Sequence, residues 1–361
     1  MIVCGHFLTI EERMLEFLRK RWFLVGLLTL ISAGMILGAN VSSAKLGWIY
    51  DLINPRVVTF IVLFLMSFSL DSAQLKRSAR FPGPVAWASS VNFIFIPLSG
   101  LLLMRFQNPT DFRYGLMVAA SVPCTMAAAS VWTRKANGND AVSLLVTILT
   151  NGFCFAITPF WLNFAIPGNI SFDFWKMVLR LVTAVLVPTL LGQSVRQHRR
   201  MNVIARKYKT PLGVVAQSCV LLIVFSAACK AGTRIAEAKN FLNASDIAVV
   251  WGTCIGIHLL AMFVAYRGSR LWGFSLQDSI ATAFAGSQKT LPIGILLAMD
   301  ESMFGNPNLL GEGVGVPFVV FPMLMYHASQ LFIDTAIADR FARKVQESNP
   351  EEVSRKMEKE A

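Results

Sequence analysis

Ten long apolar runs constrain the fold of this 361-residue chain more than any other feature. A helix needs about 20 mostly apolar residues to cross the hydrocarbon layer of a bilayer, which is about 30 Å thick. The runs have roughly that length, and charged residues, Pro or Gly bound them. We place the runs at 22–39, 56–72, 83–104, 113–136, 139–165, 175–195, 211–231, 246–266, 276–299 and 312–336. The pattern predicts an all-α polytopic membrane protein with ten transmembrane helices.

The composition agrees with this prediction and excludes an ordinary soluble domain. The hydrophobic set makes up 55% of the residues and charged residues 15%, whereas soluble domains average about 45–50% apolar and about 25% charged residues. The net charge of +12 would suggest nucleic-acid binding in a soluble chain, but here the basic residues flank apolar runs. The six cysteines show no CxxC spacing, which disfavours a metal site. We therefore expect membrane lipid, and no nucleic acid, around this chain.

The basic residues also predict the orientation of the spans, because Lys and Arg are retained on the cytoplasmic side during insertion. With ten spans, most of the 33 Lys and Arg residues lie on the side of the N-terminus. We expect a multi-pass protein of a plasma membrane, bacterial in origin, with both termini cytoplasmic. The predicted units are a cytoplasmic segment (1–21), two halves of five spans (22–165 and 166–338) and a charged cytoplasmic tail (339–361).

The fourth and ninth spans carry helix-breaking and polar residues at membrane depth. Pro123 lies near the middle of the fourth span, and Gly286 and Pro292 flank the polar residues 287–290 of the ninth. Unpaired backbone groups in lipid are costly, so a broken helix is tolerated only where protein or a water-filled cavity satisfies them. We predict that both helices unwind at these positions and that the breaks form a site.

Each interrupted span is the fourth of its half. A repeat with an odd number of spans places its copy upside down in the membrane, and transporters built this way bind substrates and ions where broken helices meet near the midplane. We therefore predict two inverted five-helix repeats with crossing helices 4 and 9. The alternative is a pair of Pro-kinked helices that pack through small residues and have no role in transport.

Lys289 is the most unusual residue of the ninth span. A lysine at the centre of a span costs about 2.5–3.5 kcal/mol on insertion scales, so it needs a partner or a cavity. No acidic residue falls in the central part of any predicted span; the nearest candidates, including Asp278 and Asp334, fall at or beyond span ends. A lysine at this depth would then be tolerated because an anionic ligand or backbone carbonyls stabilise it, or because it loses its charge. We interpret His258 and His327 as hydrogen-bonded packing residues.

Three segments resemble the bile acid:sodium symporter superfamily, and its SBF-like branch in particular. They are FAGSQKTL at 284–291, ANGNDAVS at 136–143 leading to Thr147, and NFIFIP at 92–97. The resemblance covers nearly the whole chain. It implies ten helices split into a panel and a core, and a carrier of organic anions that are commonly moved with sodium.

The resemblance also implies candidate ligands for two sodium ions. The first set corresponds to Ser130, Ser143 and Thr147, and the second to Asn92, Ala285, Ser287 and Gln288. Two positions depart from the family pattern: the glutamate of helix 9 falls at Phe284, and the asparagine beside the family's glutamine falls at Lys289. Without the acid, a sodium site relies on hydroxyls, amides and carbonyls, which are a weaker ligand set for a hard cation.

These observations predict a secondary active transporter of a small organic anion that works by alternating access and couples to sodium. The alternative is a proton-coupled or uncoupled carrier in which the Lys289 ammonium takes the place of a bound cation. Apart from Na⁺ we expect no cofactor. An enzyme is disfavoured because the chain has no HExxH motif and no acid pair at membrane depth. A regulatory membrane protein that does not transport is the third hypothesis.

Overall fold

The computed structural model describes residues 10–70, 82–126, 128–166, 173–237, 243–300, 304 and 316–348, with 10–21, 43, 51, 316 and 317 as backbone alone. Every regular element in these residues is a helix, and no strand occurs among them. In chain order they are α1 (Ile10–Asn40), α2 (Ser43–Leu52), α3 (Pro55–Ser69), α5 (Pro82–Ser90), η1 (Val91–Phe95), α6 (Ile96–Leu103), η2 (Met104–Phe106), α7 (Thr110–Ser121), α8 (Ala128–Lys135), α9 (Asp140–Ala165), α10 (Phe174–Leu181), η3 (Val182–Leu186), α11 (Val187–Gln197), α12 (Arg199–Lys207), α13 (Lys209–Glu237), α14 (Ala244–Leu271), α15 (Leu276–Ser287), α16 (Leu291–Ala298), α19 (Val316–Val319) and α20 (Phe321–Ser348).

Seven helical segments are long and apolar enough to cross a membrane. They are Trp22–Asn40, Ala44–Ser69, Pro82–Phe106, Asp140–Ala165, Phe174–Gln197, Lys209–Ala236 and Ala244–Leu271. Each of the seven overlaps one of the spans predicted from the sequence. The all-helical, multi-pass prediction is therefore confirmed at this level.

The other three predicted spans are helical too, but they are not uninterrupted apolar rods. The fourth consists of α7 and α8, which have 12 and 8 residues. The ninth consists of α15 and α16, which also have 12 and 8 residues. The tenth is mainly α20, whose N-terminal half carries the buried polar residues His327, Gln330 and Asp334. The part of this span before Val316 lies outside the described residues.

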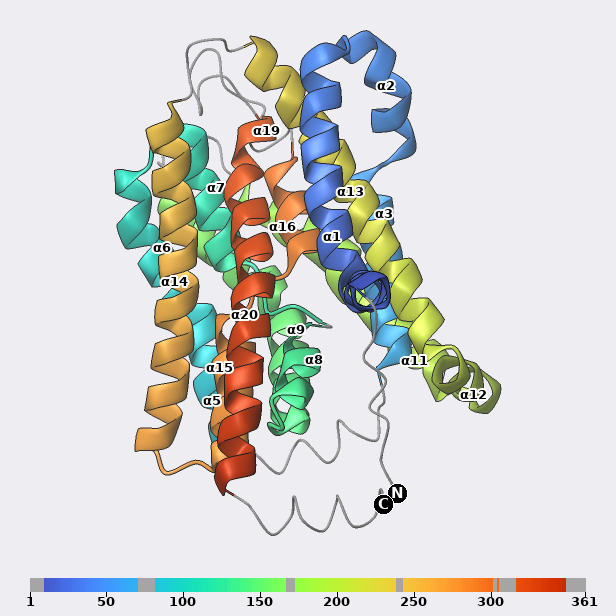
Figure 1. The fold of residues 1–361 in the computed structure, drawn as a ribbon. Helices are drawn as coiled ribbons and strands as arrows, with labels where there is room; N and C mark the ends of the chain where they lie inside the picture. Colours follow the sequence, from blue (N-terminus) through green and yellow to red (C-terminus); the bar gives the residue numbers. More distant parts are fainter. Residues whose placement is uncertain are drawn as a thin grey trace.

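The helices form two groups that meet at the broken helices (Figure 1). In one group α1 packs on α13, and α3 packs on both α11 and α13. In the other group α15 is surrounded by α5, α9 and α14, while α20 packs on α7 and α14. The half-helix α16 touches α3 and α13 on one side and α7 and α20 on the other. The ninth span thus bridges the two groups.

Glycines bring α1 and α13 into close contact. A Cβ atom on Gly38 would overlap the backbone of Cys229, and one on Gly232 would overlap the backbone of Met35. The hydroxyl of Thr233 donates to the carbonyl of Gly38 at 3.0 Å. Because membrane helices associate largely through van der Waals packing, small residues that allow such an approach stabilise the pair.

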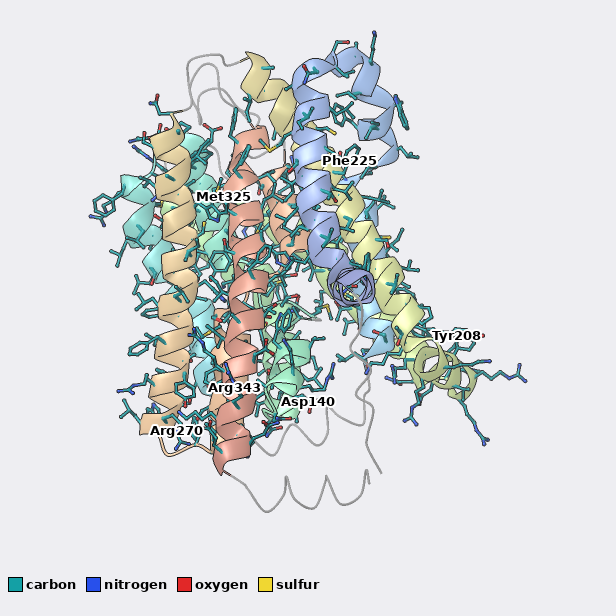
Figure 2. All side chains as sticks on the ribbon, in the orientation of Figure 1. Asp140, Tyr208, Phe225, Arg270, Met325 and Arg343 are labelled. Atoms are coloured by element: carbon teal, nitrogen blue, oxygen red, sulfur yellow. The ribbon has the colours of Figure 1, made fainter. Side chains whose placement is uncertain are left out.

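The end of the bundle from which α12 projects carries many charged side chains (Figure 2). Arg270 and Arg343 lie at this end together with Asp140, and Tyr208 marks the junction of α12 with α13. Helix α12 itself contains Arg199, Arg200, Arg206 and Lys207. This end of the bundle therefore carries Arg270, Arg343 and the basic residues of α12.

Candidate functional site

The two breaks in the helices lie against each other. Between α7 and α8 the chain is non-helical from Val122 to Met126, and between α15 and α16 it is non-helical from Gln288 to Thr290. The backbone N–H of Thr290 donates to the carbonyl of Pro123 at 2.9 Å. The two interrupted segments are thus in contact and hydrogen-bonded to each other, and we call this point of contact the crossing.

The limits of the second break differ from the predicted ones. Pro123 lies within its break, but Gly286 belongs to the last turn of α15 and Pro292 to the first turn of α16. Proline fits the first helical turn because its missing N–H would have no helical partner there. A Cβ atom on Gly286 would lie 3.1 Å from Cβ of Ala265, so this glycine permits close packing of α15 on α14. Both residues flank the break instead of forming it.

The Lys289 ammonium is fully buried at the crossing and has three oxygen acceptors. It donates to the Asn92 carbonyl at 2.8 Å, to Asn92 Oδ1 at 3.1 Å and to the Val122 carbonyl at 2.8 Å. Val122 follows the last residue of α7, so its carbonyl lacks a partner within that helix. An ammonium has three N–H donors, and each finds one acceptor. The partners are carbonyl and amide oxygens, which was one of the predicted alternatives.

Asn92 connects the third span to the ninth. Its amide nitrogen Nδ2 lies 3.4, 3.3 and 2.9 Å from the carbonyl oxygens of Ala285, Gly286 and Gln288. Asn92 lies in the π-helical turn η1, and such widened turns are frequent at functional sites.

The widened turn itself is held open by a proline and a tryptophan. Pro97 has no N–H, so it cannot donate to the carbonyl of Phe93 one turn earlier. The indole of Trp161 donates to that carbonyl instead, at 2.7 Å. The third span therefore keeps its altered shape without an unsatisfied buried carbonyl.

Gln330 on α20 satisfies the backbone of the second break. Its Oε1 accepts from the Lys289 N–H at 2.9 Å, and its Nε2 donates to the Lys289 carbonyl at 2.9 Å. His327 Nδ1 lies 3.3 Å from the same carbonyl. The side-chain amide thus takes the place of the helical hydrogen bonds that residue 289 has lost.

The expectation that no acidic residue lies in the central part of a span is wrong for Asp334. This residue is fully buried; His258 Nε2 lies 2.9 Å from its Oδ1, and Gln288 Nε2 donates to its Oδ2. The sequence analysis placed it at the end of the tenth span, whereas α20 continues to Ser348. The polar residues at positions 327, 330 and 334 share one helix face, and this spacing was the signal that would have identified the acid.

In the first predicted sodium set, the hydroxyls of Ser143 and Thr147 contact residues outside the set. Ser143 Oγ is 2.6 Å from Thr133 Oγ1, and Thr147 Oγ1 donates to the Thr125 carbonyl at 3.3 Å. The buried Ser130 hydroxyl has no hydrogen-bond partner among the described residues. Phe284, at the position of the family's acid, is fully buried in an apolar cluster.

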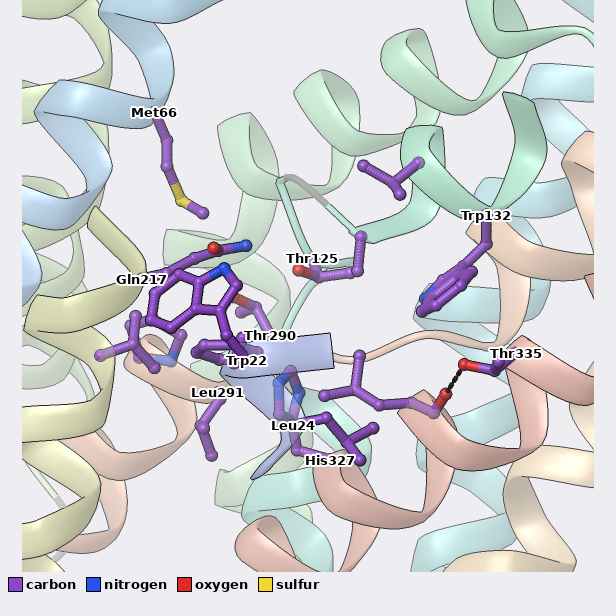
Figure 3. Close-up of a pocket in the computed structure, with 16 residues that line it drawn as sticks. Trp22, Leu24, Met66, Thr125, Trp132, Gln217, Thr290, Leu291, His327 and Thr335 are labelled. Atoms are coloured by element: carbon purple, nitrogen blue, oxygen red, sulfur yellow. Dashed lines mark hydrogen bonds between the residues drawn. The ribbon is translucent and has the colours of Figure 1, made fainter. Parts of the chain in front are cut away.

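A cavity of about 210 Å³ lies beside the crossing (Figure 3). Thr125 and Thr290 come to its wall from the two breaks, and Trp22, Trp132, Gln217 and His327 come from α1, α8, α13 and α20. Most of the other lining residues are apolar, and no Asp, Glu, Lys or Arg is among the described ones. A pocket of this kind, apolar with a few placed polar groups, is typical of small-molecule sites.

Comparisons with known proteins agree with this architecture. Residues 21–343 match the SBF-like CPA transporter family. The chain is 23% identical over 326 residues to the sodium/bile acid cotransporter 7 of Danio rerio, covering 88% of this chain and 93% of the relative. It is 23% identical over 334 residues to the Rattus norvegicus protein of the same name, covering 90% and 93%. It is 26% identical over 301 residues to an uncharacterized protein of Pseudomonas aeruginosa, covering 80% and 85%.

The matched region includes every span and both breaks, and the resemblance seen in the sequence is confirmed. The chain belongs to the SBF-like CPA transporter family and is a multi-pass membrane transporter related to the bile acid:sodium symporters.

Proposed function

We propose that the protein is a secondary active transporter that moves a small organic anion by alternating access. The observation that carries the proposal is the hydrogen bond between Thr290 and Pro123, which joins two broken helices beside a cavity. Broken helices that meet at a substrate cavity are the arrangement by which secondary transporters expose one site to either side of the membrane.

We propose further that the chain forms two inverted five-helix repeats. In support, the fourth span of each predicted half is divided in the same way, into helices of 12 and 8 residues. The basic end of the bundle, with α12, Arg270 and Arg343, is then cytoplasmic under the positive-inside rule. Both termini and the charged tail lie on that side in this arrangement.

The cavity offers positive partial charge without a cationic side chain. Ala128 and Leu291 begin α8 and α16 and line the cavity, and helix N-termini favour an anionic group. The indole N–H of Trp132, another lining residue, has no hydrogen-bond partner among the described residues. These groups suit an anion with an apolar body.

Substitution of Trp132 by phenylalanine is expected to weaken substrate binding by about ten- to a hundredfold. The phenyl ring keeps most of the apolar surface but removes the N–H donor, and a hydrogen bond to a charged group contributes about 1.5–3 kcal/mol. A thermal-shift screen of purified protein against organic anions identifies the substrate, because a ligand at 100 times its Kd stabilises by about 2.7 kcal/mol. Uptake into proteoliposomes then compares the variant with the wild type.

The matched control is Trp175→Phe, since Trp175 is 76% exposed and far along the chain from the cavity residues. Its uptake and binding are expected to equal those of the wild type. Failure of every organic anion to bind or to be taken up would contradict the proposed function. It would favour the alternative of a regulatory membrane protein that does not transport.

The coupling ion is the remaining choice. The names of the vertebrate relatives include sodium, which favours a sodium-coupled carrier. The contacts of Lys289 favour a carrier that uses this residue in place of a cation.

A further inference from the structure

We propose that the Lys289 ammonium is a built-in cation that takes the place of a transported sodium ion, so that this carrier works without sodium. The inference rests on the proposed function and concerns its energy coupling. It is drawn from the oxygen atoms around Lys289 and from the chemistry of the two residue sets that correspond to sodium ligands.

The surroundings of the ammonium are those of a bound cation. Its three acceptors are two backbone carbonyls and one amide oxygen, from two different spans, at 2.8–3.1 Å. A protonated amine has three donors, whereas a neutral amine has two donors and a lone pair that would face an oxygen. Three oxygen partners therefore match the charged form. The side chain supplies a positive charge at the crossing that no diffusing ion needs to supply.

Most acceptors of the second sodium set form hydrogen bonds, although the side-chain oxygen Oε1 of Gln288 is buried without a partner among the described residues. Asn92 uses Oδ1 to bind Lys289, and it turns Nδ2 toward the carbonyls of Ala285, Gly286 and Gln288. Those carbonyls face an N–H donor, although a sodium ion would require them as ligands. A sodium ion at Asn92 Oδ1 would also lie close to the ammonium, and like charges repel strongly inside a protein.

The first sodium set lacks negative charge. Phe284 stands where the family pattern has an acid, and its ring packs edge-on against Phe341 at 6.0 Å. The hydroxyls of Thr133 and Ser143 bond to each other. A hard cation prefers carboxylate and carbonyl oxygen ligands, and the Phe284 ring offers neither. None of the residues in the two sets carries a carboxylate, so a sodium ion at either set would lack a carboxylate ligand from that set.

A fixed counter-charge accompanies the fixed cation. Asp334 is fully buried, and Gln288, the neighbour of Lys289 in the chain, donates to its carboxylate. His258 holds the other carboxylate oxygen. The Asp334 carboxylate is thus joined through Gln288 to the residue next to it, Lys289, and the histidines His258 and His327 lie at the same place.

The test measures thermal stability of the purified full-length protein in sodium chloride and in choline chloride at equal ionic strength. The wild type is expected to have the same midpoint in both salts. The variant Phe284→Glu/Lys289→Asn restores the acid and removes the ammonium, and its midpoint is expected to rise by several degrees in sodium. Lys176→Asn, which removes an exposed lysine, is the control and is expected to behave as the wild type.

A midpoint of the wild type that is higher in sodium chloride than in choline chloride would overturn the proposal. If the double variant does not fold, equilibrium dialysis of wild-type protein with radioactive sodium decides: no bound ion supports the proposal and one bound ion refutes it. These readouts require no transport. A protein that moves no anion but is indifferent to sodium would therefore contradict the proposed function, whereas one that moves an anion and binds sodium would contradict this inference alone.

Discussion

Replacement of Lys289 by methionine is expected to lower the free energy of unfolding by about 1–3 kcal/mol, the cost of leaving buried hydrogen-bond acceptors without their donor. Methionine preserves the length of the side chain and removes the ammonium. Two carbonyls and the amide oxygen of Asn92, all facing Lys289 Nζ, then lose their donor in a place that water does not reach. Thermal unfolding in mild detergent measures the loss.

The control for this prediction is Lys344→Met, because Lys344 is an exposed residue whose ammonium binds the hydroxyl of Tyr266 at 3.0 Å. Surface contacts of this kind contribute about 0–1 kcal/mol, so we expect little change. Equal stability of the Lys289 variant and the wild type would show that the ammonium does not hold the crossing together.

Substitution of Gly38 by valine is expected to destabilise the protein by about 3 kcal/mol, at the upper end of the usual cost of overpacking. The first added carbon would overlap the Cys229 carbonyl, and a backbone group cannot rotate away as a side chain can. Helices α1 and α13 would have to separate, and the hydrogen bond from Thr233 to Gly38 would be lost. The measurement is the unfolding midpoint, compared at equal detergent concentration.

Gly256→Ala provides the matched control for that substitution. Gly256 lies inside α14, and a Cβ atom there would meet nothing within 4 Å. Alanine is the better helix former by about 1 kcal/mol, so the control variant is expected to be as stable as the wild type or slightly more so. A Gly38 variant that matches this control would contradict the close contact between α1 and α13.

The sequence predicted the helical spans because each depends on local information: a run of apolar residues long enough to cross a bilayer. The breaks could be located in the same way, since Pro123 and the polar residues 287–290 interrupt otherwise apolar segments. The predicted limits of the second break were less accurate. Pro292 in the first turn of α16 and the packed Gly286 of α15 produce the same local sequence pattern as an unwound segment.

The partners of the breaks could not be predicted in this way, because they come from distant parts of the chain. Gln330 bonds to the backbone of Lys289 across 41 positions, and the Lys289 ammonium reaches Asn92 across 197. Asp334 was placed at a span end because composition marks where apolar residues stop, whereas α20 continues as a helix beyond the apolar part. The cavity likewise requires the tertiary structure, since its wall combines residues from the first span to the tenth.

The most direct test of the crossing is a density map from electron cryo-microscopy in lipid nanodiscs, at a resolution that shows side chains. We expect non-helical density at residues 122–126 and 288–290, contact between Thr290 and Pro123, and the Lys289 amine between Asn92 and Val122. Two continuous helices that pass without contact, or a Lys289 side chain that faces lipid, would contradict the account.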